Sequence, residues 1–86
     1  MNELNSILQR REYGKINIKL KEQLDARKMT RNYLARKIDT RFEVINKWYN
    51  NSVEKIDADV LARICFALKC EVGDIVEYVG EANEAE

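Results

Sequence analysis

The 86-residue sequence contains no histidine and no proline, and it has only two cysteines and three glycines. Without histidine, the chain lacks the most common general base and the most common metal ligand of proteins. Two cysteines are too few for a disulfide framework, which indicates a reducing, cytoplasmic environment. The absence of proline and a glycine-free stretch over residues 15–72 favour helices over a turn-rich β fold. Together these absences argue against an enzyme.

Long apolar runs are also missing from the sequence. No segment approaches the roughly 18 apolar residues that cross a membrane. Near the start of the chain, Leu4, Ile7 and Leu8 are separated by polar residues, so no signal peptide is expected. The chain is nevertheless 45% hydrophobic and 35% charged, which is too apolar for intrinsic disorder. We therefore expect one small folded domain.

The net charge is zero, but the charges are unevenly distributed. Residues 1–50 hold twelve Lys or Arg and six Asp or Glu, whereas residues 51–86 hold three and nine. The cations are densest over residues 27–47, where seven Lys or Arg accompany two acids. A basic half beside an acidic half is typical of a protein that binds a polyanion and stays in solution. A solvated helix surface would carry the same charges, so the remaining patterns decide between the two.

The spacing of apolar residues predicts helices over residues 19–28, 31–38 and 41–49. Thr30 is suited to begin the second of these, and Asp57 is suited to begin a longer helix, because their side-chain oxygens can accept hydrogen bonds from the first backbone amides. Residues 50–52 are typical of a loop, and residues 75–79 fit either a helical turn or a strand.

Apolar and polar residues alternate in two short segments, residues 16–20 and 75–79. We expect these segments to pair as a two-stranded ribbon that closes the domain. The expected fold class is all-α, with four to five short helices in addition to this ribbon. The expected organisation is an arm or short helix over residues 1–14, one folded helical domain over residues 15–79 and an acidic, flexible tail over residues 80–86.

Residues 31–49 match a helix-turn-helix, in which two short helices are joined by a tight turn and the second presents a polar outer face. Ala35 supplies the small residue that is needed where the two helices cross. Leu34 and Ile38 in the first helix, and Ile45 and Trp48 in the second, supply the inward apolar side chains. The outward residues of the second helix are then Phe42, Glu43, Asn46 and Lys47.

Two segments, TRNYLARKIDTRFEVINKWYNN and KIDADVLARICFALKCEVGDIVEYV, resemble the Cro and lambda-repressor-like (xenobiotic-response-element type) helix-turn-helix family of bacterial and phage regulators. The resemblance covers residues 16–79 and is closest to a small single-domain subgroup. It implies a lambda-repressor-like bundle and a sequence-specific DNA-binding transcriptional regulator. Such a protein is expected to act as a repressor or a small accessory regulator and to bind double-stranded DNA as a homodimer.

The resemblance also implies roles for individual residues. Arg31, at the start of the first motif helix, would contact a phosphate or the adjoining base, and Arg41 would hold a phosphate. Asn50 and Asn51 would touch the phosphate backbone from the loop after the second helix. Two residues depart from the family pattern: Asp39 stands where a glycine is usual in the turn, and Thr40 stands where a buried aliphatic residue is usual.

The outward residues of the second helix have side chains that can recognise bases. Lys47 could donate to guanine O6 and N7 or hold a phosphate, and Asn46 could form two hydrogen bonds with adenine. Glu43 could accept a hydrogen bond from cytosine N4. Phe42 could rest on a thymine methyl group or pack against the preceding helix.

The remaining residues with reactive or aromatic side chains predict structural roles. Cys65 and Cys70 are expected to lie on different faces and to act as small buried hydrophobic residues. Trp48, with Tyr49, could stack on a base, but packing between helices explains it better. No catalytic residue, metal site or cofactor is expected. Dispersed acids are expected to cap helices and to interact with helix dipoles, namely Asp57, Asp59, Glu71 and Asp74.

A second function is compatible with the sequence: a protein-interaction module whose acidic C-terminal half binds another protein, as an antitoxin binds its toxin. The cations of residues 27–47 favour DNA binding, because a pure interaction module does not need them. The dimer surface is expected on the last long helix and residues 75–79, with the apolar residues of the N-terminal arm as a further contribution. Neither a membrane nor a small-molecule ligand is expected as a partner.

Overall fold

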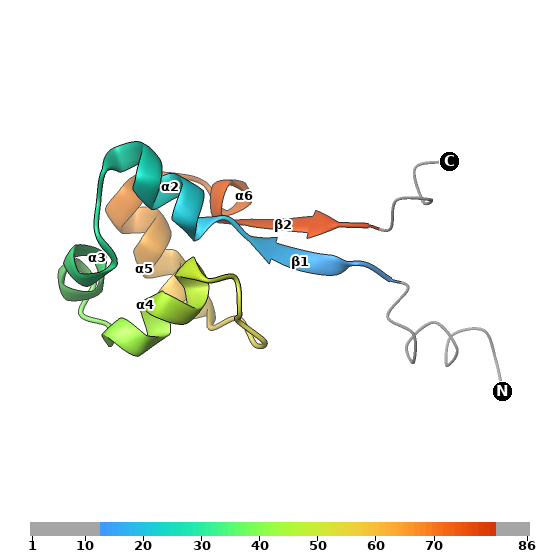
Figure 1. Cartoon of the computed structure of the whole chain (residues 1–86), viewed down its shortest axis with the longest axis horizontal. Helices are drawn as coiled ribbons and strands as arrows, with labels where there is room; N and C mark the ends of the chain where they lie inside the picture. Colours follow the sequence, from blue (N-terminus) through green and yellow to red (C-terminus); the bar gives the residue numbers. More distant parts are fainter. Residues whose placement is uncertain (1–12, 81–86) are drawn as a thin grey trace, which may run out of the picture.

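The computed structural model describes residues 13–80 of the chain. Five helices form a body at one end of the described region, and a two-stranded ribbon projects from it (Figure 1). The elements in chain order are β1 (Lys15–Ile18), α2 (Leu20–Arg27), α3 (Arg31–Lys37), α4 (Phe42–Tyr49), α5 (Ala58–Leu68), α6 (Val72–Ile75) and β2 (Val76–Val79). The expected helical bundle with a small ribbon is confirmed. The expected arm and tail fall outside the described residues, apart from residues 13, 14 and 80.

The helices begin where the sequence places suitable capping residues. The Thr30 hydroxyl accepts a hydrogen bond from the Tyr33 amide at 3.0 Å, and an Asp57 carboxylate oxygen accepts from the Asp59 amide at 2.8 Å. Both capping predictions are confirmed. At the other end, α2 and α5 are each followed by a lysine in the left-handed conformation, Lys28 and Lys69. A left-handed residue reverses the chain and allows the last carbonyls of a helix to find backbone partners.

The ribbon pairs β1 with β2 in antiparallel register, and Ile16 lies opposite Tyr78. The pairing prediction is confirmed, and of the two overlapping expectations for Leu20 the helix over residues 19–28 is the correct one. Leu20 belongs to α2 instead of the strand, because the chain leaves the ribbon at Lys19, whose amide donates to the Ile75 carbonyl at 2.7 Å. Residues 75–79 combine both expected alternatives, since Ile75 ends the short helix α6 and β2 follows directly.

The core lies between the helices and the near end of the ribbon. All the inward residues expected for the helix-turn-helix are buried, and Trp48 retains only 2% of its surface exposed. The packing interpretation of Trp48 is therefore confirmed. Among residues 13–80, no polar or charged residue is buried. The buried side chains are Ile18, Leu20, Leu24, Leu34, Ala35, Ile38, Ile45, Trp48, Ile64, Leu68 and Ile75.

The expectation for the two cysteines, Cys65 and Cys70, was wrong in part. Both pack against the core as expected, but they are half-buried rather than buried, and their thiols are neighbours. The left-handed Lys69 turns the chain back over the end of α5, so the Cys70 amide donates to the Cys65 carbonyl at 3.1 Å. Burial raises the pKa of the Cys70 thiol, and the adjacent Cys65 thiol raises it further. Five-residue spacing separates two side chains only while the helix continues, and here α5 ends between them.

Candidate nucleic-acid interface

The turn between α3 and α4 is tight and has a left-handed residue at its centre. Asp39 has φ 54°, and the Thr40 amide donates to the Ala35 carbonyl at 2.9 Å. Asp adopts this conformation with less strain than most residues, so it can replace the glycine that is usual in the family. The Thr40 hydroxyl donates to the Ile38 carbonyl at 3.2 Å, which gives this half-buried polar side chain a partner. Both departures from the family pattern are accommodated.

Helix α4 has one buried and one accessible face. Ile45 and Trp48 point into the core, whereas Glu43 and Lys47 are exposed and Asn46 is half-buried. Phe42 keeps 38% of its surface exposed at the start of the helix, so its ring is available on the same side. The second helix begins one residue later than expected, because Arg41 has an extended backbone and precedes the first helical residue. The four expected base-reading residues therefore share one accessible side.

Arg31 links the start of α3 to the accessible side of α4. Its Nη1 donates to Asn46 Oδ1 at 2.7 Å, and its guanidinium lies 4.5 Å from the centroid of the Tyr49 ring and 5.8 Å from that of Phe42. This network was not predicted from the sequence. The spacing of Phe42, Asn46 and Tyr49, at positions i, i+4 and i+7, places them on one stripe and was the available signal. Arg31 thus orients Asn46 while the second lone pair of Oδ1 and the amide N–H groups stay available.

The two asparagines after α4 differ in their surroundings. Asn50 is exposed, and its side chain makes no polar contact with the rest of residues 13–80. Asn51 has φ 57°, accepts a hydrogen bond from the Ile18 amide at 2.8 Å and donates to Asn17 Oδ1 at 2.8 Å. Asn51 therefore ties β1 to the end of α4, a structural role that sequence reasoning missed. Contact of either residue with phosphate stays a prediction.

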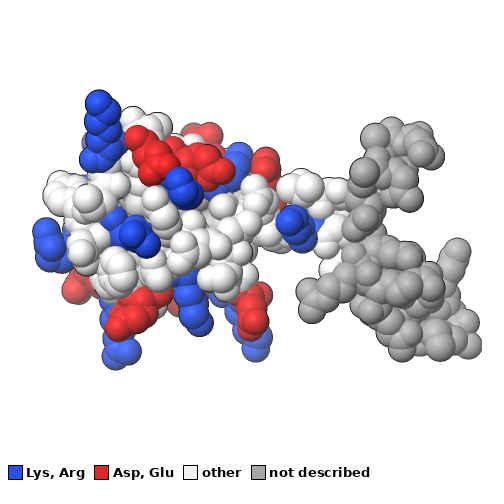
Figure 2. Space-filling view, viewed as in Figure 1, with Lys and Arg blue, Asp and Glu red and all other residues white. Residues whose placement is uncertain are grey.

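Several cations around α3 and α4 have no partner within the described residues. Figure 2 shows Lys and Arg side chains projecting around the end of the body where α3 lies, and acidic side chains, together with further Lys and Arg, along the upper and lower edges of the same view. The exposed cations of residues 27–47 whose side chains form no hydrogen bond, ion pair or ring contact within residues 13–80 are Lys28, Arg36, Arg41 and Lys47. Such uncommitted cations can neutralise phosphates without breaking internal contacts.

Within residues 13–80, no group of three or more His, Cys, Asp or Glu side chains is arranged to hold a metal ion. In that region no helix has the length and apolar character needed to cross a bilayer.

The comparisons with known proteins agree with this geometry. The model of the Cro/C1-type HTH DNA-binding domain matches residues 19–81. The transcriptional regulator VanUg is similar in structure, with a TM-score of 0.66 and 28% sequence identity over 80% of this chain and 91% of that chain. A Bacteroides fragilis protein provisionally described as DNA-binding shares the fold, with a TM-score of 0.65 and 17% identity over 73% of this chain and 100% of that one. Among curated proteins, none matches this sequence. The chain belongs to the Cro/C1-type helix-turn-helix family of DNA-binding domains.

Proposed function

We propose that this protein is a sequence-specific transcriptional regulator that reads the major groove of DNA with α4. The observation that carries the proposal is the two-sided character of α4, which buries Ile45 and Trp48 and keeps Glu43, Asn46 and Lys47 accessible on the opposite side. An α-helix fits into the major groove, where each base pair presents its own pattern of donors and acceptors. Among the accessible side chains, Glu43 is a hydrogen-bond acceptor, Lys47 is a donor and Asn46 can do both.

The bases that each side chain would recognise follow from its chemistry. Asn46 is held by Arg31, so its amide can meet adenine N6 and N7 with less loss of side-chain freedom. Glu43 would accept from cytosine N4, and Lys47 would donate to guanine or hold a phosphate. Phe42 would rest on a thymine methyl group or remain packed beside Arg31.

Phosphate contacts would fix the position of α4 in the groove without reading sequence. Arg41 is exposed immediately before α4 and has no internal partner among the described residues, which suits this role. Arg31 would contact a phosphate or the adjoining base with the N–H groups that Asn46 does not use. Asn50 would contact a phosphate with its exposed side chain. Asn51 would donate to a phosphate with the Nδ2 hydrogen that is not bonded to Asn17.

A homodimer follows from the limited reach of one recognition helix, which contacts only a few base pairs. The outer face of α5 supports this proposal, because Ala58, Ala62 and Phe66 are exposed at four-residue spacing and Phe66 is 86% exposed. An exposed apolar stripe of this kind is typical of a protein–protein interface. We place the dimer surface on α5 and β2, and we propose that the dimer acts as a repressor in a bacterium or phage.

The proposal is tested by selecting bound sequences from random duplex DNA and measuring affinity for the selected duplex at two salt concentrations. We expect a palindromic motif with half-sites about one helical turn apart and a salt dependence equivalent to about four or more phosphate contacts. Salt-sensitive binding without a motif would indicate a nonspecific DNA-binding protein. Absence of binding by the folded protein would overturn the proposal and favour an interaction module whose partner is another protein.

A further inference from the structure

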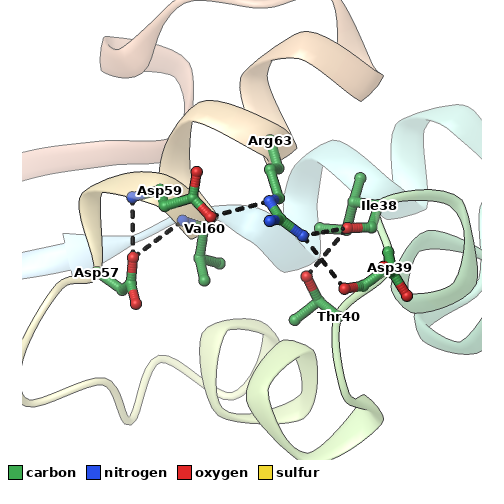
Figure 3. Close-up of polar contacts among 7 residues, drawn as sticks. All are labelled: Ile38, Asp39, Thr40, Asp57, Asp59, Val60 and Arg63. Carbon is green, nitrogen blue, oxygen red and sulfur yellow. Dashed lines mark hydrogen bonds and ion pairs between the residues drawn. The ribbon is translucent and has the colours of Figure 1, made fainter.

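One arginine connects α5 to the turn of the helix-turn-helix. Arg63 Nη1 donates to the Ile38 carbonyl at 2.9 Å and to the Asp39 carbonyl at 3.2 Å, and Arg63 Nε lies 2.9 Å from Asp59 Oδ2 (Figure 3). Figure 3 shows the guanidinium between the carboxylate on one side and the two turn carbonyls on the other. The side chain thus spans from the first turns of α5 to the junction of α3 and α4.

The two carbonyls belong to the part of the motif that needs external partners. The end of α3 is closed by backbone hydrogen bonds, because the Asp39 and Thr40 amides donate to the Arg36 and Ala35 carbonyls. The Ile38 and Asp39 carbonyls lie beyond Lys37, the last residue of α3, where the helix supplies no further amide donor. The Ile38 carbonyl accepts from both Arg63 and the Thr40 hydroxyl, and Asp39 is the left-handed residue that reverses the chain. Hydrogen bonds from a charged donor are stronger than those between neutral groups. Arg63 therefore binds the backbone where the direction of α4 is set.

The guanidinium is itself held in place from within α5. Asp57 caps the helix by accepting from the Asp59 and Val60 amides at 2.8 and 3.2 Å, which fixes the first turn (Figure 3). Asp59, on that turn, then pairs with Arg63 four residues later. An isolated surface pair of this type contributes little to stability. The Asp59–Arg63 pair instead orients the planar guanidinium toward the carbonyls of the turn.

We propose that Arg63 is a positioning residue for the recognition helix: it locks the turn between α3 and α4 and so sets the angle at which α4 meets DNA, without touching DNA itself. This inference rests on the proposed function. It predicts that the loss of Arg63 loosens the turn and weakens binding to the selected duplex, while the number of phosphate contacts stays the same.

The test uses Arg63→Met, which keeps the apolar stem of the side chain and removes every donor, and Arg63→Lys, which keeps the charge and removes the planar fork. Arg36→Met is the matched control, because Arg36 is an exposed arginine of α3 without a side-chain contact among residues 13–80. Asp59→Asn keeps Arg63 but removes the carboxylate that aims it. Trp48 fluorescence during urea unfolding shows which variants remain folded.

Two readouts separate positioning from direct contact. Amide hydrogen exchange reports on the turn itself through the Thr40 amide, which is bonded to the Ala35 carbonyl. We expect Arg63→Met to speed exchange at Thr40 by about tenfold and to weaken DNA binding by about tenfold, with an unchanged salt slope. Arg63→Lys and Asp59→Asn should give smaller changes of the same kind. Arg36→Met should leave exchange at Thr40 unchanged.

Several results would overturn the proposal. Unchanged exchange at Thr40 in Arg63→Met would show that Arg63 does not hold the turn. A salt slope reduced by about one would make Arg63 a direct phosphate contact. A change of oligomeric state in sedimentation would place Arg63 in the dimer surface. If the wild-type protein binds no duplex, the proposed function fails, and so does the role of Arg63 in orienting α4 toward DNA. Hydrogen exchange at Thr40 still shows in that case whether Arg63 holds the turn.

Discussion

Asn51 offers the sharpest test of how the recognition helix is connected to the rest of the fold. In Asn51→Ala, the Ile18 amide loses its acceptor at a residue that is only 5% exposed, which costs about 1–3 kcal/mol. Alanine must also adopt the left-handed conformation found at φ 57°, which costs about 1 kcal/mol. The free energy of unfolding should therefore fall by about 2–4 kcal/mol. For a domain of this size, such a loss is a large part of the total stability.

A series of substitutions at this position separates the two contributions. Asn51→Gly loses the same hydrogen bonds but relieves the backbone strain, so it should cost less than Asn51→Ala. Asn51→Asp keeps an acceptor for the Ile18 amide and tolerates the left-handed conformation, so it should cost least. Asn50→Ala is the matched control, since this exposed side chain has no polar contact in the described region and its φ is −88°. We expect a change below about 0.5 kcal/mol there.

Urea unfolding followed by fluorescence measures these changes, because Trp48 is the one tryptophan of the chain and is buried. A cost below about 0.5 kcal/mol for Asn51→Ala would refute the structural role of this residue. Equal costs for the alanine and glycine variants would refute the contribution from backbone strain and leave only that from hydrogen bonding.

Three further predictions address the site, the turn and the ribbon. If Lys47 reads a base, Lys47→Ala should lose about 1–3 kcal/mol of binding free energy for the one sequence that carries this base. If Lys47 holds a phosphate, the variant should bind all duplexes more weakly, with a salt slope reduced by about one. Unchanged affinity for every duplex contradicts both roles. Asp39→Gly should raise the free energy of unfolding by up to about 1 kcal/mol, because glycine adopts φ 54° without strain; destabilisation in urea would argue against strain at this position. The hydrogen bond from Asn17 and the charge of Lys19 lower the pKa of Glu77. The ionised Glu77 carboxylate therefore stabilises the fold at pH values above its usual pKa of 4.5, and this stabilisation is lost as the pH falls through the lowered pKa. The difference in unfolding free energy between wild type and Glu77→Gln should shrink over that pH range. A difference that does not depend on pH would exclude the charge of Glu77 as its cause.

The sequence predicted the elements better than their connections. Apolar spacing and capping residues such as Thr30 and Asp57 act over one or two helical turns, so their consequences can be read from a short window. The same is true of the inward and outward faces of α4. Boundaries were less certain, as Leu20 shows, because alternation of apolar residues continues for one residue after the chain has turned into α2.

The contacts that position the recognition helix could not be predicted in this way. Asn51 bonds to Ile18 across 33 residues, Arg63 to Ile38 across 25 and Arg31 to Asn46 across 15. Periodicity assigns a residue to a face but does not identify the side chain or backbone group that meets it. A polar residue such as Asn51 can therefore have a partner within the protein that its position in the sequence does not identify, whether or not it also contacts phosphate.

An NMR titration of the isotope-labelled protein with the duplex obtained by selection tests most directly whether α4 is the recognition helix. We expect the largest amide shifts on the accessible side of α4, at Glu43, Asn46 and Lys47, at Asn50 directly after it, and at the start of α3. The amides of the ribbon should shift little on binding. Shifts concentrated on the ribbon or on α5, with α4 unaffected, would contradict the claim that α4 is the recognition helix.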